Sequence, residues 1–465
     1  MKIEQKSITL LVHNHSGVLG RVCGHIRNEG WNIKHLTVDE NSDGKFCTMQ
    51  ITLEGTYTKL QHIVERMLLI DCIQKITVDG KTVEKTRESF ESKQEKPLID
   101  KVAPKKEGVI RILAINPGST STKFAVYDNE VQVLQHTINH NKQDLLACGE
   151  IMEQKEYRKE CIQNILHDCG VELSELDAIA GRGGLVRPIT SGTYLVNDKM
   201  LEDLHGVNAG VHASALGAII ASEFAKEYNK NAYVVDPIVV DEMDRSAKLS
   251  GVPGIDRMSI FHALNQKAVA RRLAQQINKP YENCRIIVAH LGGGISVGAH
   301  RYGRVIDVTD AIAGEGPFTP ERSGSVPAIP LVKMCFSGEY TEKEMIEKLR
   351  GNGGATAYLG TNDIRKIEKM IMAGDEFAAL VMDSMAYQIS KEIGAMSAVL
   401  SGRVDGIALT GGAAHSIRLT GAIKGRVDKL APVFVFAGEN EMSALASGVL
   451  RVLRGEEHVR VYETI

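Results

Sequence analysis

The sequence lacks several features that would place it in common protein classes. No run of apolar residues approaches the ~20 that a membrane-spanning helix needs, and residues 1–6 (MKIEQK) do not begin a secretory signal. The eight cysteines are scattered and form no CxxC pair, so neither a disulfide framework nor a zinc site is expected. We therefore predict a protein of the reducing cytoplasm.

A strong charge of one sign is also absent. The net charge is -3, which gives no general attraction to nucleic acid or to an anionic membrane, so any anion binding must depend on local sites. The pattern GxxxxGK[ST] does not occur, which excludes a P-loop enzyme. What remains is a chain of 465 residues with ordinary globular composition, long enough for two to four domains.

Residues 1–80 carry an alternation of strands and helices. Apolar periodicity predicts strands at 7–13, 31–39, 45–53 and 72–78 and helices at 18–29 and 58–69. The order βαββαβ is that of the ferredoxin-like split βαβ unit. Residues 81–108, dominated by Lys, Glu, Ser and Gln, are predicted to be a charged linker.

A larger α/β unit begins at residue 109 and contains an internal repeat. Residues 110–128 and 286–300 each consist of an apolar strand, a turn rich in Gly or Ser, and a second strand. Two such elements far apart in the chain predict a duplicated α/β domain. The first lobe is assigned to residues 109–240, completed by 445–465, and the second lobe to residues 241–444.

Three turns of this unit have the composition of phosphate-binding loops. In residues 116–123 (NPGSTSTK), small residues leave N–H and hydroxyl groups free to donate to phosphate oxygens. In residues 290–294 (HLGGG), three consecutive glycines cost conformational entropy and are typical of a backbone that a phosphate approaches. Gly411 and Gly412 again follow an apolar stretch. An ordinary hairpin turn is the alternative for the first of these taken alone.

Six motifs in this order resemble the acetate kinase family, and more narrowly butyrate kinases. They are INPGSTSTK, GRGGLVRP, HASALGA, AHLGGGISVG, FTPERSGSVP and TGGAAHS, within residues 109–465. The resemblance implies a two-lobe, ribonuclease H-like α/β fold of the acetate kinase, Hsp70 and actin type. It also implies reversible phosphoryl transfer between ATP, with Mg²⁺, and a small carboxylic acid in a cleft between the lobes.

The same resemblance implies roles for individual residues. Arg182 matches the arginine on the substrate carboxylate, and Arg322 matches a second active-site arginine; a guanidinium can bind carboxylate or phosphate through two bonds. Glu441 matches a glutamate linked to Mg²⁺, with neighbouring Glu439 as the alternative. The other catalytic matches are His290, on the transferring phosphoryl group, and Asp236, Asn116 and His212. The ATP-binding matches are Gly118, Ser119, Thr120, Lys123, Gly292, Gly293, Gly294, Asp363, Arg365, Gly411 and Gly412.

Two departures from acetate kinases indicate a longer acid. Gly184 stands where those enzymes carry valine and Ala289 where they carry phenylalanine, and both positions line the acyl pocket in that family. The smaller residues would leave room for two or more further carbons, each worth up to ~0.8 kcal/mol when buried. We therefore expect butanoate or a branched short-chain acid as substrate, with acetate or propionate as the alternative.

The N-terminal unit resembles an ACT domain, most closely that of the acetolactate synthase small subunit, through residues 13–38 (HNHSGVLGRVCGHIRNEGWNIKHLTV). In that family an amino acid binds at a dimer interface, which implies Asn14, Gly17, Asn32 and Ile33 as effector-binding residues. The two resemblances together imply a homo-oligomeric kinase regulated by an amino acid such as valine. The alternatives are an ACT domain kept only for assembly and a non-catalytic amino-acid sensor. No nucleic-acid or membrane partner is expected.

Overall fold

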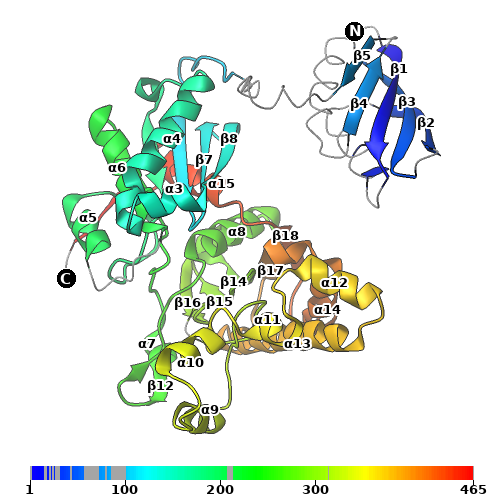
Figure 1. Cartoon of the computed structure of the whole chain (residues 1–465). Coiled ribbons are helices and arrows are strands. Elements are labelled where there is room, and N and C mark those ends of the chain that lie inside the picture. Colours follow the sequence, from blue (N-terminus) through cyan, green and yellow to red (C-terminus); the bar gives the residue numbers. More distant parts are fainter. Residues whose placement is uncertain are drawn as a thin grey trace. The chain divides into compact units, whose positions relative to one another are not determined.

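The computed structural model describes most of the chain. The described residues are 3–14, 18–19, 22, 26, 32–41, 44–56, 73–78, 81–84, 101–206, 213–312 and 314–463. The chain divides into two compact units, Met1–Ile99 and Asp100–Ile465 (Figure 1). The predicted helix at 58–69 and the site candidates Gly17 and His212 lie outside the described residues, as does most of the predicted helix at 18–29.

The N-terminal unit is a five-stranded sheet in the order β2-β3-β1-β4-β5. The strands are β1 (Ile3–His13), β2 (Asn32–Glu40), β3 (Phe46–Thr56), β4 (Ile73–Val78) and β5 (Lys81–Glu84). Alternate residues of β1, Ile8, Leu10 and Val12, pack against Val22 and Ile26 in one core, because successive side chains of a strand point to opposite faces. The four predicted strands are therefore present, and β5 lies within the segment predicted to be a linker.

The first sheet of the second unit has seven strands in the order β19-β10-β11-β9-β6-β7-β8. They are β6 (Arg111–Pro117), β7 (Ser121–Asp128), β8 (Val131–Asn139), β9 (Ala178–Gly181), β10 (Thr193–Leu195), β11 (Asn231–Val235) and β19 (Arg460–Val461). β6 pairs antiparallel with β7 and parallel with β9. The C-terminal strand β19 pairs with β10, so the end of the chain returns to this sheet.

The second sheet has the order β16-β15-β14-β17-β18. Its strands are β14 (Arg285–Leu291), β15 (Ile295–Arg301), β16 (Arg304–Val308), β17 (Gly406–Gly411) and β18 (Val433–Ala437); β12 (Leu249–Val252) and β13 (Ile255–Asp256) form a separate hairpin. β14 pairs antiparallel with β15 and parallel with β17, which repeats the pairing of β6 with β7 and β9. The internal repeat predicted from the sequence is therefore a repeat of strand topology.

Helices cover both sheets (Figure 1). They are α3 (Lys142–Ala147), α4 (Lys155–Asp168), α5 (Asp198–His205), α6 (Ala215–Glu227), α7 (Arg245–Lys248), α8 (Ala263–Gln276), α9 (Ala328–Cys335), α10 (Glu342–Leu349), α11 (Gly354–Leu359), α12 (Ile364–Met372), α13 (Glu376–Val399), α14 (Ile417–Val427) and α15 (Glu441–Leu453). In the parts of the chain that the structure describes, none of the helices has both the length and the apolar character needed to cross a membrane.

The second sheet lies between two helices. Ile286 and Val288 of β14 share a core with residues of α8, whereas Ile287 and Ala289 share a core with residues of α13. The alternation follows from the two-residue period of a strand. α8 therefore covers the face of β14 that also carries His290.

Residues 101–108, at the start of the second unit, are held against its first sheet. Lys105 forms an ion pair with Asp177 at 2.6 Å, and the carbonyl of Ala103 accepts a hydrogen bond from Arg111 at the start of β6. The predicted linker at 81–108 thus contains β5 at its start and a segment fixed to the first sheet at its end.

Candidate active site

The first phosphate turn connects β6 to β7. The N–H of Gly118 donates to the carbonyl of Ser121 at 2.7 Å, and the carbonyl of Thr120 accepts from the N–H of His140 at 2.9 Å. Ser119 and Thr120 are exposed, and within the described part of the chain their own backbone N–H groups have no hydrogen-bond partner. The turn therefore presents free donors to solvent, as a phosphate site requires.

The second phosphate turn connects β14 to β15. A Cβ at Gly294 would collide with the guanidinium of Arg322, so a larger residue there would displace that cation from its place against the turn. The hydroxyl of Thr319 donates to the carbonyl of Gly293 at 2.5 Å, which ties the loop that carries Arg322 to the turn. The N–H of Gly292 donates to the carbonyl of Gly294 at 3.2 Å.

The third turn follows β17. Gly411 has a φ of 91°, and a side chain there would collide with the backbone of Leu291, so only glycine fits. Gly412 begins a short 3-10 helix and is exposed. Two further ATP-binding matches, Asp363 and Arg365, lie at the start of α12. The carboxylate of Asp363 accepts the hydrogen bond of the Arg365 N–H and forms an ion pair with the Arg365 guanidinium at 2.9 Å. The two side chains are thus engaged with each other at the start of α12.

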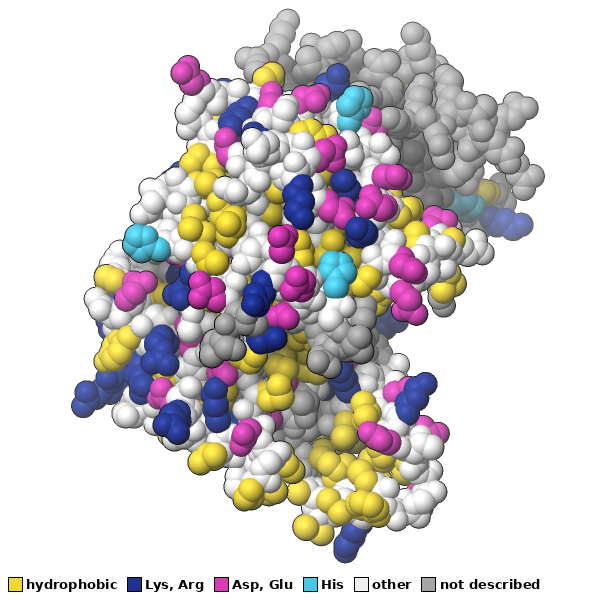
Figure 2. Space-filling model, turned by 90° about the vertical axis from the view of Figure 1, so that its left-hand side faces the viewer, with side chains coloured by type: hydrophobic (Ala, Val, Ile, Leu, Met, Phe, Trp, Pro, Cys, Tyr) yellow, Lys and Arg dark blue, Asp and Glu magenta, His cyan; other side chains and the backbone are white. Residues whose placement is uncertain are grey.

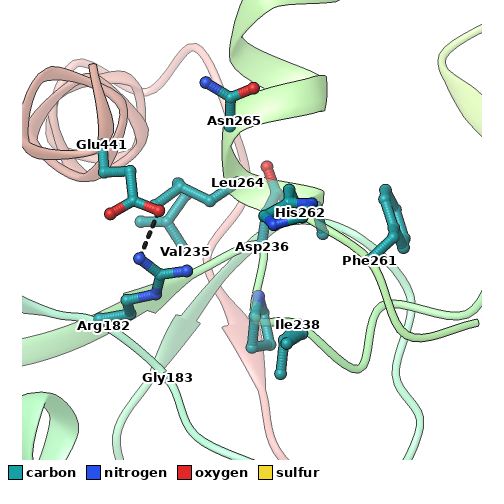
Figure 3. A pocket seen from close by; sticks show the side chains of 12 residues that line it. Arg182, Gly183, Val235, Asp236, Ile238, Phe261, His262, Leu264, Asn265 and Glu441 are labelled. Atoms are coloured by element: carbon teal, nitrogen blue, oxygen red, sulfur yellow. Dashed lines mark ion pairs between the residues drawn. The ribbon is translucent and has the colours of Figure 1, made fainter. Parts of the chain in front are cut away.

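Three segments far apart in the sequence meet at Arg182. The guanidinium of Arg182, directly after β9, forms an ion pair with the carboxylate of Glu441, the first residue of α15, and Figure 3 shows the two side chains facing each other. The amide of Asn116, at the end of β6, donates to the other carboxylate oxygen of Glu441 at 2.6 Å. The structure therefore brings together three residues that the sequence assigned to one site.

Asp236 lies in the wall of the site. It is 2% exposed and has a φ of 39°, an uncommon conformation for a residue other than glycine. Its carboxylate accepts from the N–H of Gly192 at 2.8 Å and lies 3.5 Å from the guanidinium of Arg271. Together with Arg182 and His262 it lines a small cavity (Figure 3). Both carboxylate oxygens of Asp236 thus already have protein partners.

His290 is buried at the second phosphate turn, and its hydrogen-bond partner shows which ring nitrogen carries the proton. Its Nδ1 lies 2.8 Å from Oδ1 of Asn265, whose amide nitrogen donates to the carbonyl of Glu439 at 2.6 Å. The amide oxygen must therefore accept, so the proton of His290 is on Nδ1. Burial, with a further contribution from Arg182, lowers the pKa of His290 to about 3. Its Nε2 is consequently a bare acceptor at neutral pH.

His262 is a site residue that the sequence reasoning missed. Its ring stacks on that of His290, with 3.8 Å between centroids and 11° between planes, and it lines the cavities that contain Arg182 and Arg322. Burial, then the neighbouring His290 and both arginines, lower the pKa of His262 well below its usual value. The available signal was its position, directly before α8 and after the apolar stretch that ends at Phe261.

Arg322 and Arg182 line a second, larger cavity of about 350 Å³. A guanidinium nitrogen of Arg322 donates to the carbonyl of Ala311, and its Nε is buried without a hydrogen-bond partner. Burial lowers the pKa of Arg322. The apolar part of the cavity wall includes Leu185, Ile238, Phe261, Ala311 and Ile312.

The two residues assigned to the acyl pocket do not line this cavity. A Cβ atom at Gly184 would lie 2.7 Å from Cβ of Ala215 and 2.9 Å from Leu204, so it would point toward α5 and α6. Ala289 faces the core beneath α13, on the opposite side of the sheet from His290. The prediction that these two small residues widen the acyl pocket is therefore wrong, because a Cβ at position 184 and the side chain of Ala289 both point away from the cavity.

Two carboxylates lie next to the first phosphate turn. Glu439 and Glu441 line a cavity of about 300 Å³ together with Asn116, Gly118 and Lys123. Burial, and then the charge of Glu441, raise the pKa of Glu439. No group of three His, Cys, Asp or Glu side chains suited to a metal occurs among the described residues. A pair of carboxylates nevertheless fits Mg²⁺, which proteins bind through one or two carboxylates plus substrate phosphates.

The effector residues assigned in the N-terminal unit lie far apart. The side chain of Asn14 donates to Glu40 at 2.9 Å and to the carbonyl of Gly44 at 3.2 Å, beside the start of β3. Asn32 and Ile33 pair with the other end of β3, opposite Glu54 and Leu53. Eight residues of strand separate these ends, ~27 Å at the usual rise. One small amino acid cannot touch Asn14 and Asn32 of the same copy.

Comparisons with known proteins give a consistent result. The model of the Acetokinase family matches residues 192–421, and that of the AHAS small subunit-like ACT domain matches residues 8–74. The chain is similar to the solved structure of Porphyromonas gingivalis acetate kinase, with 19% identity and a TM-score of 0.62 over 74% of this chain and 100% of that chain. A propionate kinase from Francisella tularensis subsp. tularensis has 18% identity and a TM-score of 0.60 over 73% and 98%. These likenesses confirm the predicted fold, an ACT-like domain followed by a two-lobe kinase fold.

Proposed function

We propose that this chain, which contains an acetokinase-family domain and an N-terminal ACT domain, is an ATP-dependent kinase that converts a small carboxylic acid to an acyl phosphate. The main support for this proposal is the position of Arg182 between two cavities. It lines both the polar cavity at the first phosphate turn and the cavity with the apolar wall. A carboxylate and a phosphoryl group bound in these two cavities would meet at one guanidinium.

The reaction needs charge neutralisation more than proton transfer. A carboxylate oxygen attacks the terminal phosphorus of ATP, and the bond from that phosphorus to the leaving oxygen of ADP breaks. The acid is already ionised and ADP leaves as an anion, so no general base is required. Arg182 and Arg322 would offset the repulsion between the two anions and stabilise the transferring phosphoryl group.

His262 is the histidine that we assign to the phosphoryl group. Its Nδ1 lies 2.9 Å from the hydroxyl of Ser296, which also accepts from the side chain of Gln266 at 2.8 Å. The hydroxyl proton of Ser296 can then be donated to Nδ1, which leaves the proton of His262 on Nε2. A neutral His262 would thus be a donor, whereas His290 presents no proton on Nε2.

Glu439 and Glu441 are the residues that would hold Mg²⁺, which neutralises phosphate charge when it is bound. Asn116 and Lys123 line the same cavity and would contact the nucleotide phosphates. Because Glu441 is paired with Arg182, entry of the acid and of the metal would have to separate this pair.

Butanoate or a branched acid of similar size is the substrate that we propose. Its support is the cavity of about 350 Å³, the volume of roughly ten liquid water molecules, with Leu185, Ile238 and Ile312 in the wall. Gly184 and Ala289 no longer contribute to this argument. The alternative is acetate or propionate.

The test is acyl phosphate formation, trapped as hydroxamate, with ATP, Mg²⁺ and straight or branched acids of two to six carbons. We expect the highest kcat/KM at four or five carbons. A maximum at two or three carbons would identify an acetate or propionate kinase. If none of these acids gives a product, the kinase proposal is rejected and the alternative of a non-catalytic amino-acid sensor remains.

Amino-acid regulation would require at least two copies of the chain, because Asn14 and Asn32 lie at opposite ends of the sheet. The second unit also has a surface suited to self-association. No residue of α9 is buried, and Ile329 and Val332 on this helix are exposed, as is Phe336 directly after it. Hydrophobic side chains also gather at the lower end of the face in Figure 2. Exposed apolar patches mark contact surfaces, so we propose a homo-oligomer.

A further inference from the structure

Two fully buried arginines lie near opposite ends of β6. Arg111 begins the strand and pairs with Asp128 at 2.7 Å and with Glu175 at 2.9 Å. Arg158, on α4, lies against the turn that follows the strand. Within the described residues Arg158 forms no ion pair, so its positive charge has no counter-ion there. The two arginines are equally buried, but Arg111 has two acidic partners, whereas Arg158 has none among the described residues.

Every hydrogen bond of Arg158 goes to a neutral acceptor. One terminal nitrogen donates to the carbonyls of Gly118 and Ser121, both at 3.0 Å, and to the hydroxyl of Thr122 at 2.9 Å. The other donates to the carbonyl of Ser119 at 3.1 Å. Four of its contacts thus fall within the first phosphate turn. The side-chain oxygen of Gln154, one helical turn earlier, accepts the remaining bonds at 3.2 and 2.9 Å.

These contacts fix which side of the turn its backbone carbonyls face and which side its N–H groups face. Because the guanidinium holds the carbonyls of Gly118, Ser119 and Ser121 on the inner side, the free N–H groups of Ser119 and Thr120 remain on the exposed side. The cation itself lies directly beneath those donors.

A buried charge without a counter-ion is expensive, because it has lost its hydration. Burial accordingly lowers the pKa of Arg158. An anion bound above the turn would offset part of this cost. Because Arg158 is fully buried, its attraction for an anion at the turn would act partly through protein and would be screened less than the attraction between two exposed charges.

We propose that Arg158 is a positioning residue for the nucleotide: it fixes the first phosphate turn from below, and the phosphate chain of ATP is its counter-ion. The inference rests on the proposed use of ATP. It predicts that the contribution of Arg158 scales with ligand charge and is absent for uncharged adenosine.

The decisive variant supplies a counter-ion from the protein. Gln154→Glu is nearly isosteric and places a carboxylate where the guanidinium already donates. We expect it to raise the thermal midpoint and to raise the Kd for ATP on the order of tenfold, the size of a charge interaction across several ångströms of partly buried protein. The Kd for adenosine should stay within about twofold, because adenosine carries no phosphate charge.

Arg158→Lys is the second variant, and Arg111→Lys is its matched control, because both residues are fully buried. Arg158→Lys should raise KM for ATP while KM for the acid stays unchanged, since lysine keeps the charge but cannot hold four acceptors of the turn. Arg111→Lys should lower the thermal midpoint and leave both KM values unchanged. Binding would be measured by calorimetry with ATP, ADP and adenosine on the full chain.

An unchanged Kd for ATP in Gln154→Glu would overturn the proposal, and so would an equal loss of ATP and adenosine affinity, which indicates a merely structural role. Calorimetry also separates this inference from the proposed reaction. If wild type binds ATP with the expected charge dependence but forms no acyl phosphate, the reaction fails and the role of Arg158 stands. If wild type binds no ATP, both fail.

Discussion

The guanidinium of Arg182 is paired with the carboxylate of Glu441, so the residue proposed for the acid and the residue proposed for the metal hold each other. Asn116 donates to the second oxygen of that carboxylate. Both groups are therefore positioned before any ligand binds, and each must exchange its partner when substrates enter. Their functions are expected to be interdependent.

Removal of either site arginine should abolish most turnover. Arg182→Ala and Arg322→Ala are each expected to lower kcat by at least ~10²-fold, the usual loss when a donor to the transition state is removed. The hydroxamate assay gives the rate, and circular dichroism confirms that the variants fold. Arg454→Ala is the control, because Arg454 pairs with Glu130 at the surface, and its rate should be unchanged. Near-normal activity in Arg182→Ala or Arg322→Ala would remove that residue from the site.

Glu441 and Glu439 can be separated by their metal dependence. Glu441→Gln keeps the shape of the side chain but removes the charge, so we expect a higher Mg²⁺ concentration at half-maximal rate. Glu439→Gln should have a smaller effect, because burial and the charge of Glu441 raise the pKa of Glu439 and disfavour its charged form. Magnesium titrations of the initial rate would show the difference. A larger effect at Glu439 would reverse the assignment.

The preference of the enzyme for the chain length of the acid should change when the cavity wall is substituted, but not when the core beside β14 is substituted. Ile312→Phe fills the cavity beside Arg322, so kcat/KM for a four-carbon acid should fall relative to acetate by ~15-fold, at about fourfold for each of the two extra methylenes. Ala289→Phe overpacks the core beneath α13 and should cost ~1–3 kcal/mol of stability without changing this ratio. If Ala289→Phe changes the ratio of kcat/KM for the four-carbon acid to that for acetate, Ala289 lines the acyl pocket after all.

Effector binding should need two copies of the chain. Calorimetry of the full chain with valine, leucine and isoleucine is expected to show binding that Asn14→Ala and Asn32→Ala each abolish. If a site takes Asn14 from one copy and Asn32 from another, a one-to-one mixture of the two variants should regain about a quarter of the sites, because half the dimers are mixed and each has one intact site of two. No recovery after subunit exchange would contradict a shared site.

The coupling to the kinase can be tested by deletion of residues 1–99. This boundary keeps the ion pair of Lys105 with Asp177, which a deletion through residue 105 would remove. If the N-terminal unit transmits the effector, the deletion should leave catalysis intact and abolish any response to the amino acid. Identical kinetics with and without effector in the full chain would leave the domain as an assembly module.

Buried neutral histidines should make the protein sensitive to acid. His300 is fully buried between Tyr281 and Gln266, and burial lowers its pKa to about 3. The unfolded chain, with an ordinary pKa of about 6.5, binds more protons than the folded chain between pH 6.5 and 3. Stability should therefore fall as pH falls through this window, by up to ~1.4 kcal/mol per pH unit for this group. Thermal midpoints at pH 7.5, 6.5 and 5.5 should decline less steeply in His300→Gln. Equal slopes would show that His300 is not held neutral.

Part of the backbone could be predicted from the sequence. The apolar periodicity identified the four strands of the first unit, and the glycine turns identified the ends of β6, β14 and β17. Gly411 was recognisable because a positive φ and a close backbone contact favour glycine at that position. These features depend on the local backbone conformation, which is determined mainly by residues close together in the sequence.

Only the tertiary structure decided which side chains face the site. A Cβ at position 184 and the side chain of Ala289 point away from the cavity, the ring of His262 stacks on that of His290, and Asn14 and Asn32 lie at opposite ends of a sheet. Consecutive residues of a strand face opposite sides, so a shift of one position changes the neighbours of a side chain completely. Which side is the cleft depends on helices and strands that come from distant parts of the chain. Arg158 shows the same limit, because its turn is formed by residues some forty positions earlier.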